Sequence, residues 1–122
     1  MSRITEDKER ENRIMMEVVV DAYDEVERAM GWYYYLADGL SFPFNAKCIA
    51  QRTISPLTEG EKVEVIEMAS EDECEREMFV VIEWQNRTLA VPLSQLEGIE
   101  VDEGTQQVIE DWHYWVNRGY QF

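Results

Sequence analysis

Cysteine and histidine are scarce in this chain of 122 residues, which has two cysteines and one histidine. Cys48 and Cys74 are far apart and form no C-x-x-C pair, so we expect free thiols rather than a disulfide. Together with His113 they are too few for a four-ligand zinc site. No apolar run approaches the ~18 residues of a membrane span, and the charged start does not resemble a secretory signal. These absences predict a cytoplasmic protein.

Basic residues are also few, since 11 Lys and Arg stand against 26 Asp and Glu, for a net charge of −15. Nucleic acids and anionic membranes are therefore not expected as partners, because both are bound through clustered basic side chains. An acidic excess favours cations or a basic protein partner. Hydrophobic residues make up 45% of the chain, which is enough for a core, so we expect one domain over residues 1–122.

Motifs for catalysis are missing as well. The sequence has no G-x-x-x-x-G-K-[ST], G-x-G-x-x-G or H-E-x-x-H. A nucleophile–histidine arrangement would have to use His113, which stands between Trp112 and Tyr114 on a predicted helix. A partly buried structural histidine is the better interpretation. We therefore expect that the protein is not an enzyme.

The N-terminal segment, residues 1–40, has helical periodicity. Apolar residues recur at spacings of three and four, at Met15, Val19, Ala22, Tyr23, Val26 and Met30. We expect a break near 21–24, with Asp24 capping a second helix and Glu27 completing the cap. Gly39 is expected to end that helix in a left-handed conformation.

Residues 41–101 have the pattern of short strands. Five are predicted, over 45–52, 62–68, 77–84, 88–91 and 98–101, with a tight hairpin connection at 85–87 and a helical turn capped by Ser94. In residues 102–122 we expect a helix capped by Asp102, with Trp112 and Trp115 on its apolar face. The predicted fold class is α+β, a small five-stranded antiparallel SH3-like barrel flanked by N-terminal helices and a C-terminal helix. An open antiparallel sheet is the alternative.

The densest aromatic block, Trp32–Tyr35, is followed closely by one acid, Asp38. Burial of the aromatic residues would hold Asp38 at the edge of the core, where its carboxylate could bind a hard cation. Calcium prefers six to eight oxygen ligands from carboxylates, carbonyls and water. The alternative is that Asp38 bonds backbone N–H groups at the helix end.

No contiguous EF-hand loop is present, because the pattern fails from both Asp21 and Asp102. A calcium site must therefore combine separate parts of the chain. Acidic residues gather in three clusters, which are 71–77, then Glu17, Asp21, Asp24 and Glu25, and finally Asp102, Glu103, Glu110 and Asp111.

Each cluster also has a simpler interpretation. In the first we expect Asp72, Glu73 and Glu75 to join Asp38, although a solvated loop is equally compatible. The second could give a weaker site, formed by Asp21, Asp24 and Glu25, although a helix cap explains Asp24. The third is interpreted mostly as a cap, a helix start and a solvated face.

Several strings of this sequence resemble one protein family. They are AMGWYYYL with Asp38 at 29–38, FPF at 42–44, SPL at 55–57, LAVPL at 89–93 and DWHYW at 111–115. The chain resembles the cyanobacterial-type calcium-binding proteins linked to heterocyst differentiation, over about residues 15–122. The resemblance implies calcium binding outside the EF-hand class, and Asp38 matches the important acid after the aromatic block.

The sequence thus predicts a non-EF-hand calcium-binding protein that buffers or senses cytosolic Ca²⁺. Asp38, Asp72, Glu73, Glu75, Asp21, Asp24 and Glu25 are its candidate ligands. The alternative is an acidic protein–protein interaction module without metal, which would bind a basic protein.

Overall fold

Helices and strands follow one another in the predicted order in the computed structural model, which describes residues 7–20 and 22–119. The N-terminal part contains α1 (Lys8–Arg13), the π-helical turn η1 (Ile14–Val18) and α2 (Glu25–Gly39). The middle part contains β1 (Phe44–Cys48), β2 (Lys62–Met68), the 3₁₀ turn η2 (Glu71–Cys74), β3 (Phe79–Trp84), β4 (Arg87–Pro92), the 3₁₀ turn η3 (Leu93–Gln95) and β5 (Leu96–Ile99). The chain then forms α3 (Glu103–Asn117), so the α+β class is confirmed.

The N-caps of α2 and α3 are those that the sequence predicts. The side chain of Asp24 accepts a 2.9 Å hydrogen bond from the backbone N–H of Glu27, and α2 begins directly after it. Asp102 caps α3 in the same way, through the N–H of Thr105 at 2.7 Å. Each cap satisfies a backbone donor that the first helical turn leaves without a partner.

The five strands form one antiparallel sheet in the order β4-β3-β2-β1-β5. Gln85 and Asn86 have φ angles of 50° and 66° and form the two-residue turn between β3 and β4, as such a hairpin requires. In the described part of the chain, β4 and β5 are edge strands with no pairing between them. The sheet is open, and the prediction of a closed barrel is not confirmed.

Three details differ from the predictions. Pro92 rather than Ser94 stands at the start of η3, and β5 begins two residues before the predicted strand. Gly39 does not take a left-handed conformation, since Gly60 and Gly119 are the described glycines with positive φ. It is needed for space instead, because a Cβ at Gly39 would lie 2.5 Å from Cγ1 of Val108 on α3.

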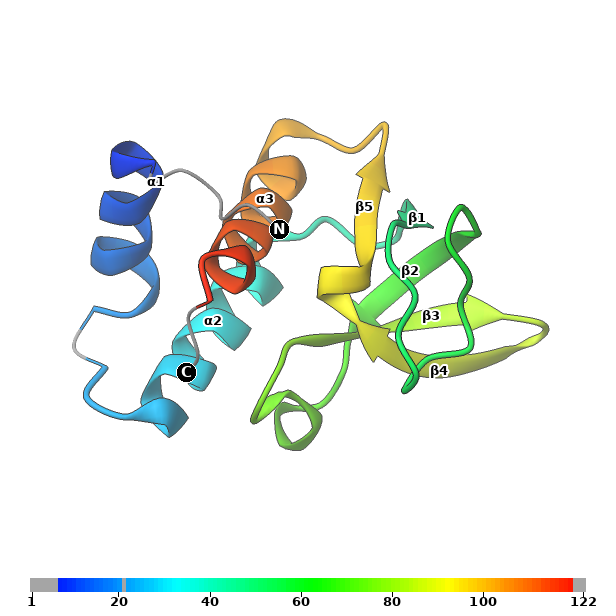
Figure 1. Ribbon diagram of the computed structural model, residues 1–122, viewed down its shortest axis with the longest axis horizontal. Helices are drawn as coiled ribbons and strands as arrows, with labels where there is room; N and C mark the ends of the chain where they lie inside the picture. The colour runs from blue at the N-terminus through cyan, green and yellow to red at the C-terminus, as the bar shows by residue number, and fades with distance from the viewer. Residues whose placement is uncertain (1–6, 21, 120–122) are drawn as a thin grey trace.

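The aromatic residues join the N-terminal and C-terminal helices. The Trp32 ring on α2 is fully buried, 5.1 Å from the Trp112 ring and 5.5 Å from the Trp115 ring on α3. Helices α2 and α3 thus pack against each other on one side of the molecule, and the sheet extends from the other side (Figure 1). No helix among the described residues combines the length and the hydrophobicity that crossing a membrane requires.

Candidate functional site

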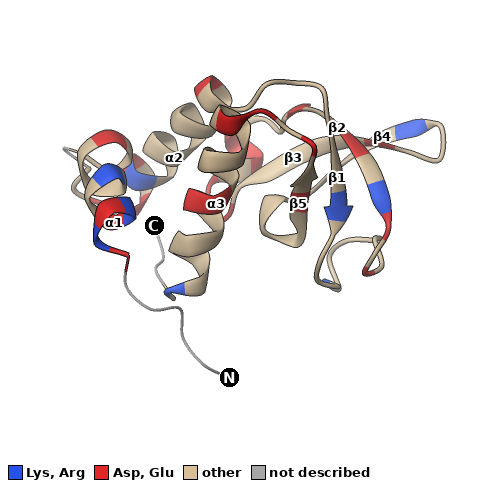
Figure 2. Ribbon diagram, turned by 90° about the horizontal axis from the view of Figure 1, so that it is seen from above, with Lys and Arg blue, Asp and Glu red and all other residues tan. Residues whose placement is uncertain are grey.

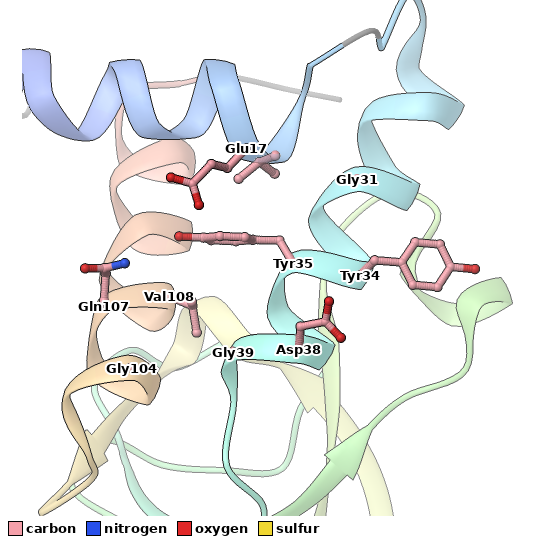
Figure 3. Close-up of a pocket in the computed structure, with 10 residues that line it drawn as sticks. Glu17, Gly31, Tyr34, Tyr35, Asp38, Gly39, Gly104, Gln107 and Val108 are labelled. Atoms are coloured by element: carbon pink, nitrogen blue, oxygen red, sulfur yellow. The ribbon is translucent and has the colours of Figure 1, made fainter.

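Asp38 lies one residue before the end of α2, and its side chain is exposed. It lines an open pocket of about 570 Å³ between α2, η1 and α3. Glu17 enters this pocket from η1, and Gln107 enters it from α3 (Figure 3). The pocket therefore holds two carboxylates from segments that are about twenty residues apart in the sequence.

The electrostatics around Asp38 are unusual for a helix end. The C-terminal end of a helix carries partial negative charge, because its last carbonyl groups have no partner within the helix. Basic side chains commonly stand there, yet the last turn of α2 has none. An acid at this position is repelled by the helix dipole, and a bound cation would relieve that repulsion.

Glycines bring the end of α2 and the start of α3 close together. A Cβ added to Gly104 would lie 3.9 Å from the backbone oxygen of Gly39. Both glycines line the Asp38 pocket. The backbone oxygen of Gly39 is therefore near the pocket, together with two carboxylates and the amide of Gln107, and oxygen atoms of these kinds are the ligands that calcium prefers.

Tyr35 forms one wall of the same pocket, and its hydroxyl donates a 2.6 Å hydrogen bond to Oδ2 of Asp111. Burial raises the pKa of Tyr35 to about 12, and the bond to Asp111 adds to the rise. In Figure 3 the ring points from α2 toward α3, with Glu17 and Asp38 on opposite sides of it. Tyr35 thus connects the pocket to the interior of the helical layer.

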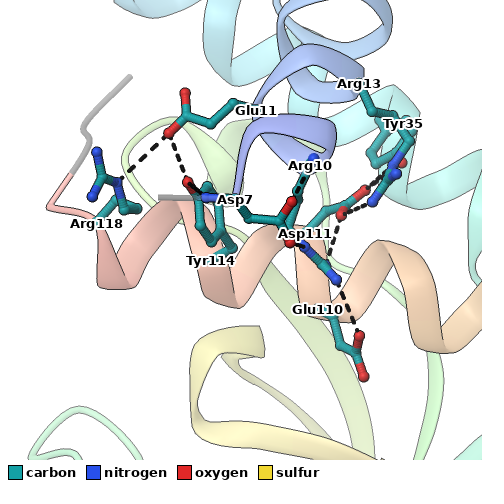
Figure 4. Close-up of polar contacts among 9 residues, drawn as sticks. All are labelled: Asp7, Arg10, Glu11, Arg13, Tyr35, Glu110, Asp111, Tyr114 and Arg118. Carbon is teal, nitrogen blue, oxygen red and sulfur yellow. Dashed lines mark hydrogen bonds and ion pairs between the residues drawn. The ribbon is translucent and has the colours of Figure 1, made fainter. Parts of the chain in front are cut away.

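Asp111 is fully buried, and two guanidinium groups surround it (Figure 4). Nη1 of Arg10 donates to Oδ1 at 2.8 Å, and Arg13 donates to Oδ1 at 2.6 Å and to Oδ2 at 3.0 Å. The hydrogen bonds to Asp111 raise the pKa of Arg13. The expectation of a solvated face is therefore wrong for Asp111, which anchors α1 on α3 and has both oxygens already occupied.

The loop acids do not line the Asp38 pocket. Asp72 and Glu75 are exposed on and beside η2, and Glu73 is occupied in a capping box with Ser70. The acid of this loop that reaches α2 is Glu71, which accepts a 2.8 Å hydrogen bond from the hydroxyl of Tyr34. The structure thus does not bring Asp72, Glu73 and Glu75 together with Asp38, and they remain predicted ligands of a separate site.

The second predicted site is only partly described. Asp24 has one carboxylate oxygen occupied by the cap of α2, Glu25 is exposed in the first turn, and Asp21 lies outside the described residues. Within residues 7–20 and 22–119, no three acidic, histidine or cysteine side chains converge on a common point. A calcium ion held there would need backbone oxygens and water in addition to carboxylates.

His113 and the cysteines have structural surroundings. Burial lowers the pKa of His113, which packs near the backbone of Leu93 and Leu96. Cys48 and Cys74 are buried and free, as predicted, and burial raises the pKa of the Cys74 thiol. None of these three side chains lines the Asp38 pocket.

Sequence reasoning placed Glu17 in an acidic cluster but did not assign it as a ligand. The 3.6-residue period of an α-helix does not give the direction of the Glu17 side chain, because Glu17 belongs to the π-helical turn η1. The burial of Asp111, in contrast, could have been predicted from its spacing in the sequence. It stands three residues after Val108 and four before Trp115, on the apolar face of α3.

Comparison with known proteins agrees with this chemistry. A family model of CcbP-type proteins, described as calcium binding, matches residues 12–116. The crystal structure of Anabaena CcbP is similar with 45% sequence identity and a TM-score of 0.88, and a calcium-binding protein solved in its calcium-binding form is similar with 44% identity and a TM-score of 0.87. All of this chain and all of each of those chains are covered. No curated protein matches the chain. The protein belongs to the CcbP family of calcium-binding proteins.

Proposed function

We propose that this calcium-binding protein holds Ca²⁺ in the pocket between α2, η1 and α3, with Asp38 as the principal carboxylate ligand. The observation that carries the proposal is the position of Asp38 in the last turn of α2, which has no basic side chain to balance it. A divalent cation there is attracted by the carboxylate and by the negative end of the helix dipole together.

Glu17 is the proposed second carboxylate. It lines the same pocket from η1, on the other side of the Tyr35 ring from Asp38, so a cation bound by both acids would require that ring to turn aside and would join η1 to the end of α2. The nearby Gly39 carbonyl and water molecules would supply further oxygens. Because the protein carries a net charge of −15, binding also reduces repulsion among neighbouring acids.

This arrangement supports a role in calcium buffering or sensing rather than catalysis. The pocket is open, and among the residues that the structure describes its lining includes no histidine, cysteine or serine that could act as a nucleophile or base. Two buried free thiols are in keeping with action in the reducing cytoplasm. The Trp32–Trp112–Trp115 contacts support the further proposal that residues 1–122 act as one domain.

Calorimetric titration with calcium tests the site. We expect Asp38→Asn to weaken calcium binding at the tighter site by at least about tenfold. Substitution of residues that only hydrogen-bond the ligands of a metal already causes losses of this size. Glu17→Gln should weaken it to a smaller extent. Asp72→Asn removes the same charge from the η2 loop and serves as the matched control, with the tighter binding unchanged. Equal losses in Asp38→Asn and Asp72→Asn, or no loss in Asp38→Asn, would reject the assignment.

A further inference from the structure

Exposed apolar side chains are concentrated in one short part of the molecule. Seven large apolar residues are exposed among those that the structure describes, and five of them fall between η1 and the first turn of α2. These five, which we call the 15–26 surface, are Met15, Met16, Val20, Tyr23 and Val26, with exposed fractions of 50 to 83%. Single exposed apolar residues are normal on any protein, but five within one stretch of twelve residues are an unusual concentration, and concentrated apolar surface suits an interaction site.

The same segment already uses its other side for packing. Ile14, Val18 and Val19 are buried, and a Cβ on Gly31 of α2 would collide with the backbone oxygen of Val18. This close approach seats η1 on α2 and leaves little freedom to rotate it. The residues of the 15–26 surface therefore face solvent while the core of the protein is complete without them.

Acidic side chains predominate along this surface, which Arg13 and Arg28 flank, whereas α1 carries charges of both signs (Figure 2). Between Ile14 and Glu27 the residues that the structure describes include no Lys or Arg and four acids, which are Glu17, Asp24, Glu25 and Glu27. Every one of these acids that the structure describes is exposed. Such a border repels a second copy of a chain with net charge −15, and it repels anionic lipid, but it attracts Lys and Arg.

We propose that the 15–26 surface binds a basic, amphipathic protein segment, with its apolar side chains on the surface and its Lys and Arg residues against the acidic border. Methionine side chains are flexible and polarizable, so Met15 and Met16 can adapt to apolar partners of different shapes. The proposal goes beyond calcium binding, and of its residues only Glu17 also belongs to the proposed Asp38 site.

A synthetic helix of leucine and lysine, with all leucines on one face, is a suitable probe when labelled with fluorescein. Its anisotropy is measured during titration with the full chain in EDTA, so that the calcium site plays no part. We expect saturable binding that weakens with added salt, because opposite charges at the border are screened. The double variant Met16→Gln/Val26→Gln should bind at least about tenfold more weakly, as expected for central apolar contacts.

Ile54→Gln is the matched control, since Ile54 is 57% exposed and belongs to the β1–β2 connection at the opposite end of the molecule from η1 (Figure 1). It should bind like the wild type. Tyr23→Ser, at the most exposed position, repeats the test if the double variant fails to fold by circular dichroism. Unchanged binding in the folded surface variants, or an equal loss in Ile54→Gln, would overturn the proposal.

Two other occupants are tested in parallel. Sedimentation of the protein alone should show a monomer, and vesicles of anionic phospholipid should not bind it. A dimer that the Met16→Gln/Val26→Gln substitutions dissociate would assign the surface to a second copy and overturn the proposal. Vesicle binding that the same substitutions abolish would assign the 15–26 surface to lipid and would also overturn the proposal.

Discussion

The hydroxyl of Tyr35 and the carboxylate of Asp111 are joined by a 2.6 Å hydrogen bond that connects the Asp38 pocket to the anchor of α1. Asp111 also binds Arg10 and Arg13, about a hundred residues away in the sequence. None of the described residues of α1 is buried, so polar contacts of this kind hold the helix in place. One fully buried carboxylate thus organises three helical segments around the pocket.

Substitution of Asp111 should destabilise the protein strongly. Asp111→Asn leaves two mostly buried guanidinium groups facing a neutral partner, and we expect the free energy of unfolding to fall by about 2–4 kcal/mol. Glu110→Gln is the control, because Glu110 faces Arg10 at 3.3 Å but its side chain is 48% exposed. Its loss should stay below about 1 kcal/mol. Urea denaturation measures both, and equal losses would contradict the role assigned to Asp111.

Alkaline pH should weaken the fold through Tyr35. The phenol titrates near pH 10 when unfolded, whereas its pKa in the folded protein is raised to about 12. Its contribution to stability is therefore complete below pH 10 and is lost as the pH rises from 10 to 12, because the unfolded chain releases the proton first. The free energy of unfolding, measured from pH 10 to 12, should decline less in Tyr35→Phe than in the wild type. Identical declines would contradict the raised pKa.

Two glycines of the pocket should respond to substitution in opposite ways. Gly39→Ala forces a Cβ within 2.5 Å of Val108, and the overpacking should cost about 1–3 kcal/mol of stability. Gly104→Ala meets its nearest atom at an ordinary 3.4 Å in the first turn of α3, so we expect no loss or a gain of up to about 1 kcal/mol. Thermal unfolding distinguishes the two variants. A neutral Gly39→Ala would show that α2 and α3 can separate at this point.

Calcium should stabilise the folded state by mass action. At about a hundredfold excess over the dissociation constant, the expected gain is about 2.7 kcal/mol for one site. The melting temperature in calcium is compared with that in EDTA, for the wild type and for Asp38→Asn. The variant should lose most of the gain, and an equal gain in both proteins would place the stabilising ion away from Asp38.

The sequence predicted those parts of the fold that depend on local patterns. The Asp24 and Asp102 caps, the tight hairpin connection at 85–87 and the apolar face of α3 could all be predicted from a few neighbouring residues, and the structure narrows the connection to Gln85 and Asn86. Closure of the sheet was not predictable in this way, because it depends on whether β4 meets β5. In the structure these strands pair with β3 and β1 respectively, which leaves the sheet open.

The candidate site was predictable to a similar extent. Asp38 could be selected because it stands three residues after the aromatic block, whose Trp32 is fully buried in the core. Its neighbour Glu17 arrives through a π-helical turn, a feature without a sequence period to reveal it. The acids of 71–77 were grouped with Asp38 by their charge and by their position between two strands, yet the loop meets α2 through Glu71 and Tyr34 instead.

A crystal structure of the protein grown with calcium tests the central claim most directly. We predict an ion in the pocket between α2, η1 and α3, with a carboxylate oxygen of Asp38 at about 2.3–2.6 Å. Calcium on Asp72, Glu73 and Glu75, with no ion in contact with Asp38, would contradict the account.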